Sequence, residues 1–268
     1  MVETIEFELK QSLDFPIEVD AICPDVIAGK SIDEVKGLPA YEGKVVRKLA
    51  DFFNISGSVG KEPSNVRIIV KNSNMKVKRI GERMSDGEIV IHGDAGMHVG
   101  DMMTGGKITI NGDADHYAGV NMKGGILSVS GNAGNYLGGA YRGDWRGMSG
   151  GKIIVEGNAG FEIGAWMRGT KKTRENGEPL IHVKGNCGLH PGHHNHGGFI
   201  VIEGDCKGKA GSEMGRGDVA VLGKTEILAS FVKTDETASE IPAINIKGPF
   251  TIYKGDTGVG GKGKLYVK

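Results

Sequence analysis

Short runs in which apolar and polar residues alternate recur along the chain and predict β-strands. The apolar positions hold isoleucine, valine or leucine, and polar residues such as Thr109, Ser128 and His182 stand between them. Alternation with a period of two and β-branched residues is typical of a strand with one buried face. Aligning the runs gives two apolar rows, which hold Ile89, Ile108, Leu127, Ile153, Ile181, Ile200, Val219 and Ile244, and Ile91, Ile110, Val129, Val155, Val183, Ile202, Val221 and Ile246.

A glycine follows each run, and the spacing of these glycines defines a repeat of 19 residues. Successive first glycines are separated by 19, 19, 26, 28, 19 and 19 residues, so two repeats carry insertions, at about 144–150 and 170–178. We expect glycine where the backbone turns with positive φ, as at Gly131, or approaches the neighbouring repeat closely. The first glycines are Gly93, Gly112, Gly131, Gly157, Gly185, Gly204 and Gly223, and the glycines seven positions later are Gly100, Gly119, Gly138, Gly164, Gly192 and Gly211.

This repeat predicts a chain that winds once per 19 residues and stacks coil on coil. Parallel strands would pair between coils about 4.8 Å apart, and parallel crossovers are nearly always right-handed. The expected fold class is therefore all-β, a right-handed parallel β-helix. A left-handed hexapeptide β-helix is not expected, because it needs an apolar residue every six positions and the inward rows here are not spaced so. A β-propeller is not expected either, because one blade needs about 40 residues. Two further inward rows are a small-residue row of Ala95, Ala114, Ala133, Ala159, Cys187 and Cys206, and a methionine-rich row of Met103, Met122, Tyr141, Met167, Asn195 and Met214.

The segment before the repeats differs in composition, with five glycines in residues 1–65 against 41 in residues 66–268. The ends of a stack of strands need covering, so we expect a small α+β capping segment over residues 1–52 and the β-helix over 53–268. Ser31 and Glu34 have the spacing of a helix capping box. Further expectations are strands at 4–9 and 17–19, degenerate first coils at 53–57 and 68–72, a less regular excursion at 224–243, and a closing strand at 264–267.

Composition narrows the class of protein. Glycine makes up 46 of 268 residues, well short of the one-third in collagen. Hydrophobic residues make up 38% and the formal net charge is zero, so disorder and bulk electrostatic binding to nucleic acid or acidic membranes are not expected. An odd number of cysteines, three, and the lack of an apolar signal segment favour a cytoplasmic protein with reduced thiols.

Residues 189–196 are rich in histidine and form the strongest candidate for metal chemistry. His193, His194 and His196 have a spacing that suits zinc. They occupy ordinary corner positions of the repeat, however, and no nearby cysteine or carboxylate completes a ligand set. We therefore expect no metal ion, no cofactor and no catalytic residue on this chain, and an exposed polar patch at the histidines.

Aromatic residues at the repeat corners are candidates for protein recognition. One outward row holds His98, Tyr117, Tyr136, Glu162, His190 and Lys209, while Trp145 belongs to the first insertion and Trp166 to a corner. Aromatic side chains on a rigid surface suit protein interfaces. The alternative is that they are isolated surface aromatics. The candidate interface residues are Tyr117, Tyr136, Trp145, Trp166 and His190.

A thirteen-residue pattern links the repeats to a known family. Residues 81–93 read Gly81-Glu-Arg-Met84-Ser-Asp-Gly87-Glu-Ile89-Val-Ile91-His-Gly93. Residues 100–112, 119–131, 145–157 and 211–223 fit the same pattern, and 192–204 fits except for Asn195 in place of methionine. These repeats resemble the GXGXG β-helix at the C-terminus of the glutamate synthase large subunit, and they resemble more closely the C subunit of formylmethanofuran dehydrogenase.

The resemblance implies a non-catalytic scaffold subunit in a complex that reduces carbon dioxide and joins it to methanofuran as N-formylmethanofuran. It implies that other subunits, one pterin-binding and one amidohydrolase-like, carry a tungsten or molybdenum pterin, iron–sulfur clusters and a binuclear metal site. A formyltransferase/hydrolase complex with a similar subunit is the first alternative. An independent zinc-binding β-helix protein is the second.

Overall fold

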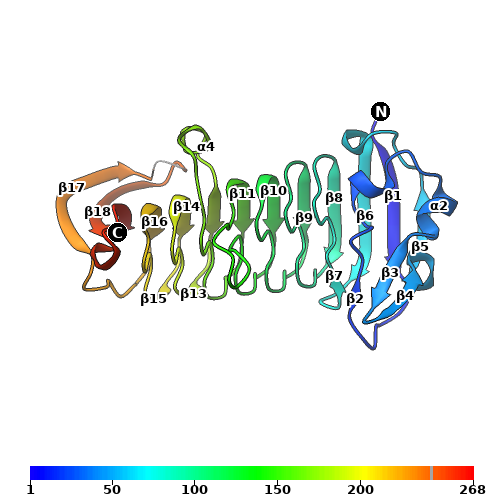
Figure 1. The fold of residues 1–268 in the computed structure, drawn as a ribbon, viewed down its shortest axis with the longest axis horizontal. Helices are drawn as coiled ribbons and strands as arrows, with labels where there is room; N and C mark the ends of the chain where they lie inside the picture. The colour runs from blue at the N-terminus through cyan, green and yellow to red at the C-terminus, as the bar shows by residue number, and fades with distance from the viewer. Residues whose placement is uncertain (242–243) are drawn as a thin grey trace.

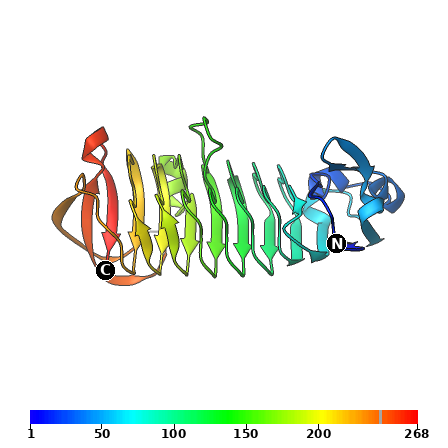
Figure 2. The same ribbon diagram turned by 90° about the horizontal axis from the view of Figure 1, so that it is seen from below.

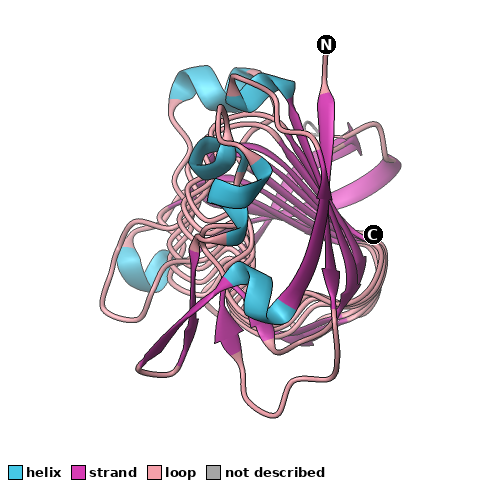
Figure 3. Cartoon of the chain, turned by 90° about the vertical axis from the view of Figure 1, so that its right-hand side faces the viewer, coloured by secondary structure: helices cyan, strands magenta, loops and turns pink. Residues whose placement is uncertain are grey.

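The chain forms an elongated row of stacked repeats with a small mixed α/β segment at its N-terminal end (Figure 1). In this computed structural model, residues 1–241 and 244–268 are described. Seen from below, the strands of successive repeats lie side by side and point the same way (Figure 2). Along the axis of the row, these strands superpose on one side, and turns and loops form the rest of the cross-section (Figure 3).

Strands dominate the described residues, and the helices are short. The helices are α1 (Pro24–Ile27), α2 (Ile32–Lys36), α3 (Leu49–Phe52) and α4 (Lys171–Glu175), with 3₁₀ turns η1 (Pro63–Asn65) and η2 (Thr257–Val259). The strands are β1 (Glu3–Leu9), β2 (Ile17–Glu18), β3 (Pro39–Glu42), β4 (Val45–Lys48), β5 (Phe53–Gly57), β6 (Val66–Ser73), β7 (Val77–Lys78), β8 (Glu88–Gly93), β9 (Lys107–Ile110), β10 (Lys123–Val129), β11 (Gly150–Val155), β12 (Leu180–Val183), β13 (Cys187–Leu189), β14 (His196–Ile202), β15 (Cys206–Gly208), β16 (Arg216–Val221), β17 (Val232–Glu240), β18 (Lys247–Gly255) and β19 (Gly263–Val267). No helix among these is long and apolar enough to cross a membrane.

One large sheet carries the repeats, in the order β17-β18-β19-β16-β14-β12-β11-β10-β9-β8-β6-β1-β5. Neighbouring strands from β8 to β16 pair in parallel, with Ile89 opposite Ile108 and Ile108 opposite Leu127. The two predicted apolar rows are confirmed through Val219 and Val221, and their side chains are buried. Each fully buried aliphatic side chain stabilises the fold by about 1.5–3 kcal/mol. The rows therefore contribute substantially to stability.

The last members of the two rows were predicted wrongly. Leu265 and Val267 of β19 lie opposite Val219 and Val221, in the places expected for Ile244 and Ile246. β18 runs antiparallel to both β17 and β19, so this part of the chain forms a meander rather than another parallel coil. Residues 264–267 continue the parallel sheet as expected. The excursion expected at 224–243 includes the long strand β17. Residues 242–243, the end of that excursion, lie outside the described residues.

The small-residue row is confirmed, since Ala95, Ala114, Ala133, Ala159 and Cys187 pair in parallel and Cys187 lies opposite Cys206. The methionine row is confirmed at Met103, Met122, Met167 and Met214, which are buried, but it is wrong at Tyr141. Met148 is the buried member of that repeat, because the chain leaves the stack after Gly138 and returns where the backbone N–H of Met148 donates to the carbonyl of Gly138. The first insertion therefore precedes Met148 rather than extending to residue 150, and the second contains α4.

The first glycines of the central repeats are required because the preceding repeat approaches them closely, and not because their φ is positive. At Gly131, a Cβ atom would lie 2.8 Å from the carbonyl oxygen of Gly112 and closer still to the carboxylate of Asp113, and φ is outside the left-handed region. Positive φ is found instead at the second glycines, such as Gly138 with φ of 60°. The expectation of positive φ at Gly131 is therefore wrong, while the requirement for glycine holds.

The Asp or Asn that follows each first glycine bonds forward to the next repeat. The carboxylate of Asp94 accepts from the backbone N–H of Asp113 at 2.9 Å, and the side-chain oxygen of Asn132 accepts from that of Asn158 at 2.9 Å. The same bond recurs from Asp113, Asn158, Asn186 and Asp205. These residues thus satisfy backbone donors between repeats.

The N-terminal segment joins the same sheet through β1, which pairs in parallel with β6. β6 pairs in parallel with β8, so residues 68–72 form the degenerate coil that was expected there. Residues 53–57 do not form a coil, because β5 runs antiparallel to β1 at the edge of the sheet. The capping box is confirmed, with the hydroxyl of Ser31 accepting from the N–H of Glu34, whose carboxylate accepts from the N–H of Ser31.

Candidate functional site

One column of corner residues has left-handed backbone without being glycine. These residues stand five positions after each first glycine and have φ between 54° and 68°: His98, Tyr117, Tyr136, Glu162, His190 and Lys209. Such backbone is unfavourable for a residue with a Cβ, by about 1–2 kcal/mol, and persists because the stacked neighbours impose it. The column is the outward row predicted from the sequence.

Within this column the aromatic rings form a continuous stack. The centroids of His98 and Tyr117 are 5.2 Å apart, and those of Tyr117 and Tyr136 are 4.8 Å apart with an interplanar angle of 6°. The guanidinium of Arg142, from the first insertion, donates to the hydroxyl of Tyr136 and lies 5.5 Å from its ring centroid. Tyr136 is only 6% exposed, so the expectation that its ring is displayed on the surface is wrong.

A buried carboxyl group lies beside this stack. Asp101 is 1% exposed, and the hydroxyl of Tyr141 donates to its Oδ2 and also lies 3.2 Å from Nδ1 of His98. Burial raises the pKa of Asp101 to about 6, against the lowering effect of the bond from Tyr141. Burial also raises the pKa of the Tyr141 hydroxyl above its ordinary value. The first insertion is thus fixed to the stack by Tyr141.

We expect Asp101 to make the protein less stable as the pH rises from about 4 to about 6. The folded pKa is raised above the ordinary value of 3.8, so the native state binds more protons than the unfolded state in this window. A pKa difference of about two units between the folded and unfolded states corresponds to a loss of about 2–3 kcal/mol in the free energy of unfolding. Replacing Asp101 by asparagine should abolish most of this dependence, as measured by urea unfolding at several pH values. The exposed Asp235→Asn variant should keep the wild-type profile, and an unchanged profile in Asp101→Asn would contradict the prediction.

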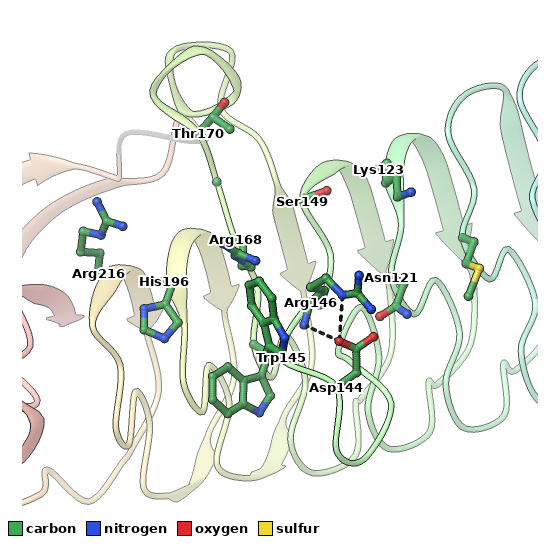
Figure 4. A pocket seen from close by; sticks show the side chains of 14 residues that line it. Asn121, Lys123, Asp144, Trp145, Arg146, Ser149, Arg168, Thr170, His196 and Arg216 are labelled. Carbon is green, nitrogen blue, oxygen red and sulfur yellow. Dashed lines mark hydrogen bonds and ion pairs between the residues drawn. The ribbon is translucent and has the colours of Figure 1, made fainter.

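The two insertions flank a hollow of about 700 Å³ (Figure 4). Asn121 and Lys123 lie at its N-terminal side, and His196 and Arg216 at its C-terminal side. Its other lining residues include Met102, Asp144, Trp145, Arg146, Trp166, Arg168 and Thr170. The cavity therefore contains both tryptophans predicted for the interface.

Positive charge dominates the walls of this cavity. Lys123, Arg146, Arg168 and Arg216 line it together with a single carboxylate, Asp144, which pairs with Arg146 at 3.0 Å. The guanidinium of Arg168 lies 4.4 Å from the ring centroid of Trp145, a cation–π contact. Trp145 is 55% exposed. Such walls suit a group that combines negative charge with a flat apolar face.

The predicted interface residues do not form a single patch. Trp145 and Trp166 line the cavity, whereas Tyr117 and Tyr136 belong to the stacked column. His190 lines a second hollow of about 620 Å³ with Phe161 and Leu189. Any role of these residues in binding a partner stays a prediction.

The histidine-rich segment separates into two parts. His193 and His194 lie next to Glu213 of the following repeat, with Nε2 of His194 3.3 Å from Oε2 of Glu213. His196 is turned away and lines the cavity. Sequence reasoning missed Glu213 because it is distant in the chain, although it stands one 19-residue period after His194. That period is the signal that could have found it.

Cys187 and Cys206 were predicted to be inward members of the small-residue row. They are buried, free and directly opposite each other on β13 and β15. Their position is that of the alanines in the preceding repeats. The structure thus gives them the packing role expected.

The fold and this surface define the class of the chain: a stacked-repeat protein whose parallel strands form a continuous row and whose insertions shape one exposed flank. None of the protein-family models matches the chain. The C subunit of the tungsten-containing formylmethanofuran dehydrogenase 2 of Methanococcus maripaludis is 51% identical over 270 residues, which cover 97% of this chain and 94% of that protein. The chain therefore belongs to the family of formylmethanofuran dehydrogenase C subunits.

Two other proteins show how far the similarity extends. The C subunit of the molybdenum-containing formylmethanofuran dehydrogenase 1 of Methanosarcina barkeri is 42% identical over 90 residues, 34% of this chain and 30% of that protein. A chain in the crystal structure of the formyltransferase/hydrolase complex from Methylorubrum extorquens, solved with methylofuran, superposes with a TM-score of 0.84. It is 26% identical, and the match covers 98% of both chains.

Proposed function

We propose that this chain is a non-catalytic scaffold subunit of formylmethanofuran dehydrogenase, the complex that reduces carbon dioxide and joins it to methanofuran as N-formylmethanofuran. The observation that carries the proposal is the 51% identity with the C subunit of a tungsten-containing enzyme along almost the whole of both chains. A row of stacked repeats with a flanking cavity suits a docking role, because stacked repeats present an extended binding surface.

The redox groups of such a complex would reside on other subunits. An iron–sulfur cluster of the four-iron type is held by four cysteine thiolates, and this chain has three cysteines in all. All three are buried and free. We therefore assign the tungsten or molybdenum pterin, the iron–sulfur clusters and the binuclear metal site to the pterin-binding and amidohydrolase-like partners.

The architecture that we infer for this scaffold is a right-handed parallel β-helix of the GXGXG type, related to the C-terminal domain of the glutamate synthase large subunit. The in-register parallel pairing of β8 through β16 supports it, and so does the strong preference of parallel crossovers for the right hand. The capping segment would extend from residue 1 through β5, which runs antiparallel at the edge of the sheet, and the β-helix would follow it.

We infer that the flank with the two insertions contacts a partner protein of the complex. Insertions on one side of a repeat array commonly form its binding face. Trp145 is exposed beside Arg168 and Arg146, and tryptophan and arginine are the residue types that contribute most at interfaces.

Purification of the full chain with an affinity tag from its native cells tests the scaffold role. We expect it to bring down other chains together with tungsten or molybdenum and iron, and to show formylmethanofuran dehydrogenase activity only in that assembly. Trp145→Ala and Arg168→Ala should each reduce the bound partners by about tenfold or more. The exposed Lys184→Ala variant should have no effect. Activity of the isolated, partner-free chain would contradict the proposal.

The superposition with the formyltransferase/hydrolase complex supports a second candidate, a scaffold in a complex that transfers and hydrolyses formyl groups without redox chemistry. The lower identity, 26% against 51%, makes it the weaker of the two. The metal content of the purified assembly separates them. Tungsten or molybdenum in stoichiometric amount indicates the dehydrogenase, and an active assembly lacking both indicates the transferase.

A further inference from the structure

Three potential metal ligands converge at one corner of two consecutive repeats. His193 and His194 come from one repeat and Glu213 from the next, and one nitrogen or oxygen of each lies within 4.8 Å of the others. Nε2 of His194 and Oε2 of Glu213 are 3.3 Å apart. Ligands bound to zinc at about 2.0–2.1 Å in a tetrahedron lie about 3.3 Å from one another. This pair therefore already has the required separation.

The neighbouring repeat also orients His193. Its Nδ1 lies 3.2 Å from the carbonyl oxygen of Ser212 and 3.0 Å from the hydroxyl of the same residue. A proton on Nδ1 would be donated to the carbonyl, which only accepts, and would leave the Nε2 lone pair free for a metal ion. Donation by the second ring nitrogen to a backbone carbonyl is the usual outer contact of a metal-ligating histidine.

His194 is also held in place. Its backbone is left-handed, with φ of 52°, and its N–H donates to the same carbonyl of Ser212 at 3.0 Å. Its ring stacks on Trp166 at a centroid distance of 3.9 Å. Side chains fixed in this way lose little further freedom when they bind an ion.

We propose that His193, His194 and Glu213 bind one divalent transition-metal ion of the zinc class. Two imidazole nitrogens and one carboxylate oxygen suit zinc and its neighbours better than calcium or magnesium, which prefer oxygen alone. Three protein ligands leave one position for water or for a donor from outside the chain. The ion joins two repeats, so its binding stabilises their stacking. This inference is independent of the proposed scaffold function.

Trp166 gives a direct readout, because paramagnetic Co²⁺ next to its stacked partner His194 quenches its fluorescence. The experiment uses the tag-free full chain after chelation. In Trp145→Phe, Trp166 is the only tryptophan left, since the chain has two. We expect Zn²⁺ calorimetry to give one ion per chain, Co²⁺ to quench Trp166, and Zn²⁺ to raise the melting temperature.

Glu213→Gln and His193→Ala should each weaken Zn²⁺ binding at least tenfold and abolish the quenching, with circular dichroism confirming that they fold. The matched control is Glu203→Gln. Glu203 also pairs with a histidine, since its Oε1 lies 2.7 Å from Nε2 of His182. The described residues bring no third ligand to that pair. This variant should bind Zn²⁺ as the wild type does. Absence of binding at micromolar Zn²⁺, or equal effects of Glu203→Gln and Glu213→Gln, overturns the proposal.

Discussion

Replacing Gly131 by valine should lower the free energy of unfolding by about 3 kcal/mol or more. The added side chain would meet the carbonyl oxygen of Gly112, with its Cβ 2.8 Å away, and the carboxylate of Asp113. Neither atom can move freely. The carbonyl accepts from the N–H of Gly131 itself at 2.9 Å, and the carboxylate accepts from the N–H of Asn132 at 2.6 Å. Urea unfolding followed by circular dichroism measures the loss.

Gly143→Val is the matched control for this variant. Gly143 lies in the first insertion with φ of 85°, and a Cβ there would have no atom within 4 Å. Its substitution introduces backbone strain alone, which costs about 1–2 kcal/mol. If the two variants lose the same stability, close approach between repeats is not the reason for glycine at position 131.

Truncating Met148 to alanine should destabilise the protein by about 3 kcal/mol, because it removes a fully buried side chain and leaves a cavity in the methionine row. Met148→Leu keeps most of the volume and should cost less than about 1.5 kcal/mol. Thermal and urea unfolding of both variants give the comparison.

Met102→Ala serves as its control. Met102 is a half-buried corner residue next to the cavity, outside the row, so its truncation should cost less than about 1 kcal/mol. A Met148→Ala variant as stable as Met102→Ala would show that Met148 is not an interior residue of its repeat.

The sequence predicted the repeats well because each repeat contacts mainly its neighbours. Apolar residues at one position of the period pack on the same position of the next, so alignment of the repeats is equivalent to contact in space. Leu127 between Ile108 and Ile153 is an example, even though 26 residues rather than 19 separate it from Ile153. The same logic placed Cys187 opposite Cys206.

Prediction failed where the period is interrupted. Tyr141 stands at the expected distance from Gly131, but the insertion begins before it and Met148 replaces it inside. Gly248 and Gly255 of β18 are seven residues apart, as the first and second glycines of a repeat are, yet β18 pairs antiparallel with β17 and β19. A glycine spacing alone does not contain the direction of a strand, which depends on contacts with the rest of the sheet.

The candidate sites show the same division. Both tryptophans were identified from the sequence, but the charged walls of the cavity come from Lys123, Arg168 and Arg216, which belong to separate repeats. Tyr136 was expected on the surface as a member of the outward row, but Arg142 from the insertion donates to its hydroxyl and Tyr136 is only 6% exposed. The repeat pattern of the sequence does not reveal which residues an inserted loop will cover.

The hydrogen bonds from the Asp and Asn side chains have a direction that matters during synthesis. In each of them the acceptor belongs to the earlier segment of the chain and the donor to the later one, as between Asp94 and Asp113. A nascent chain leaves the ribosome from its N-terminus, so every newly emerged turn meets a finished row of oxygen atoms on the turn before it. We therefore expect the repeats to be able to add one layer at a time while translation continues, each finished layer offering acceptors to the next.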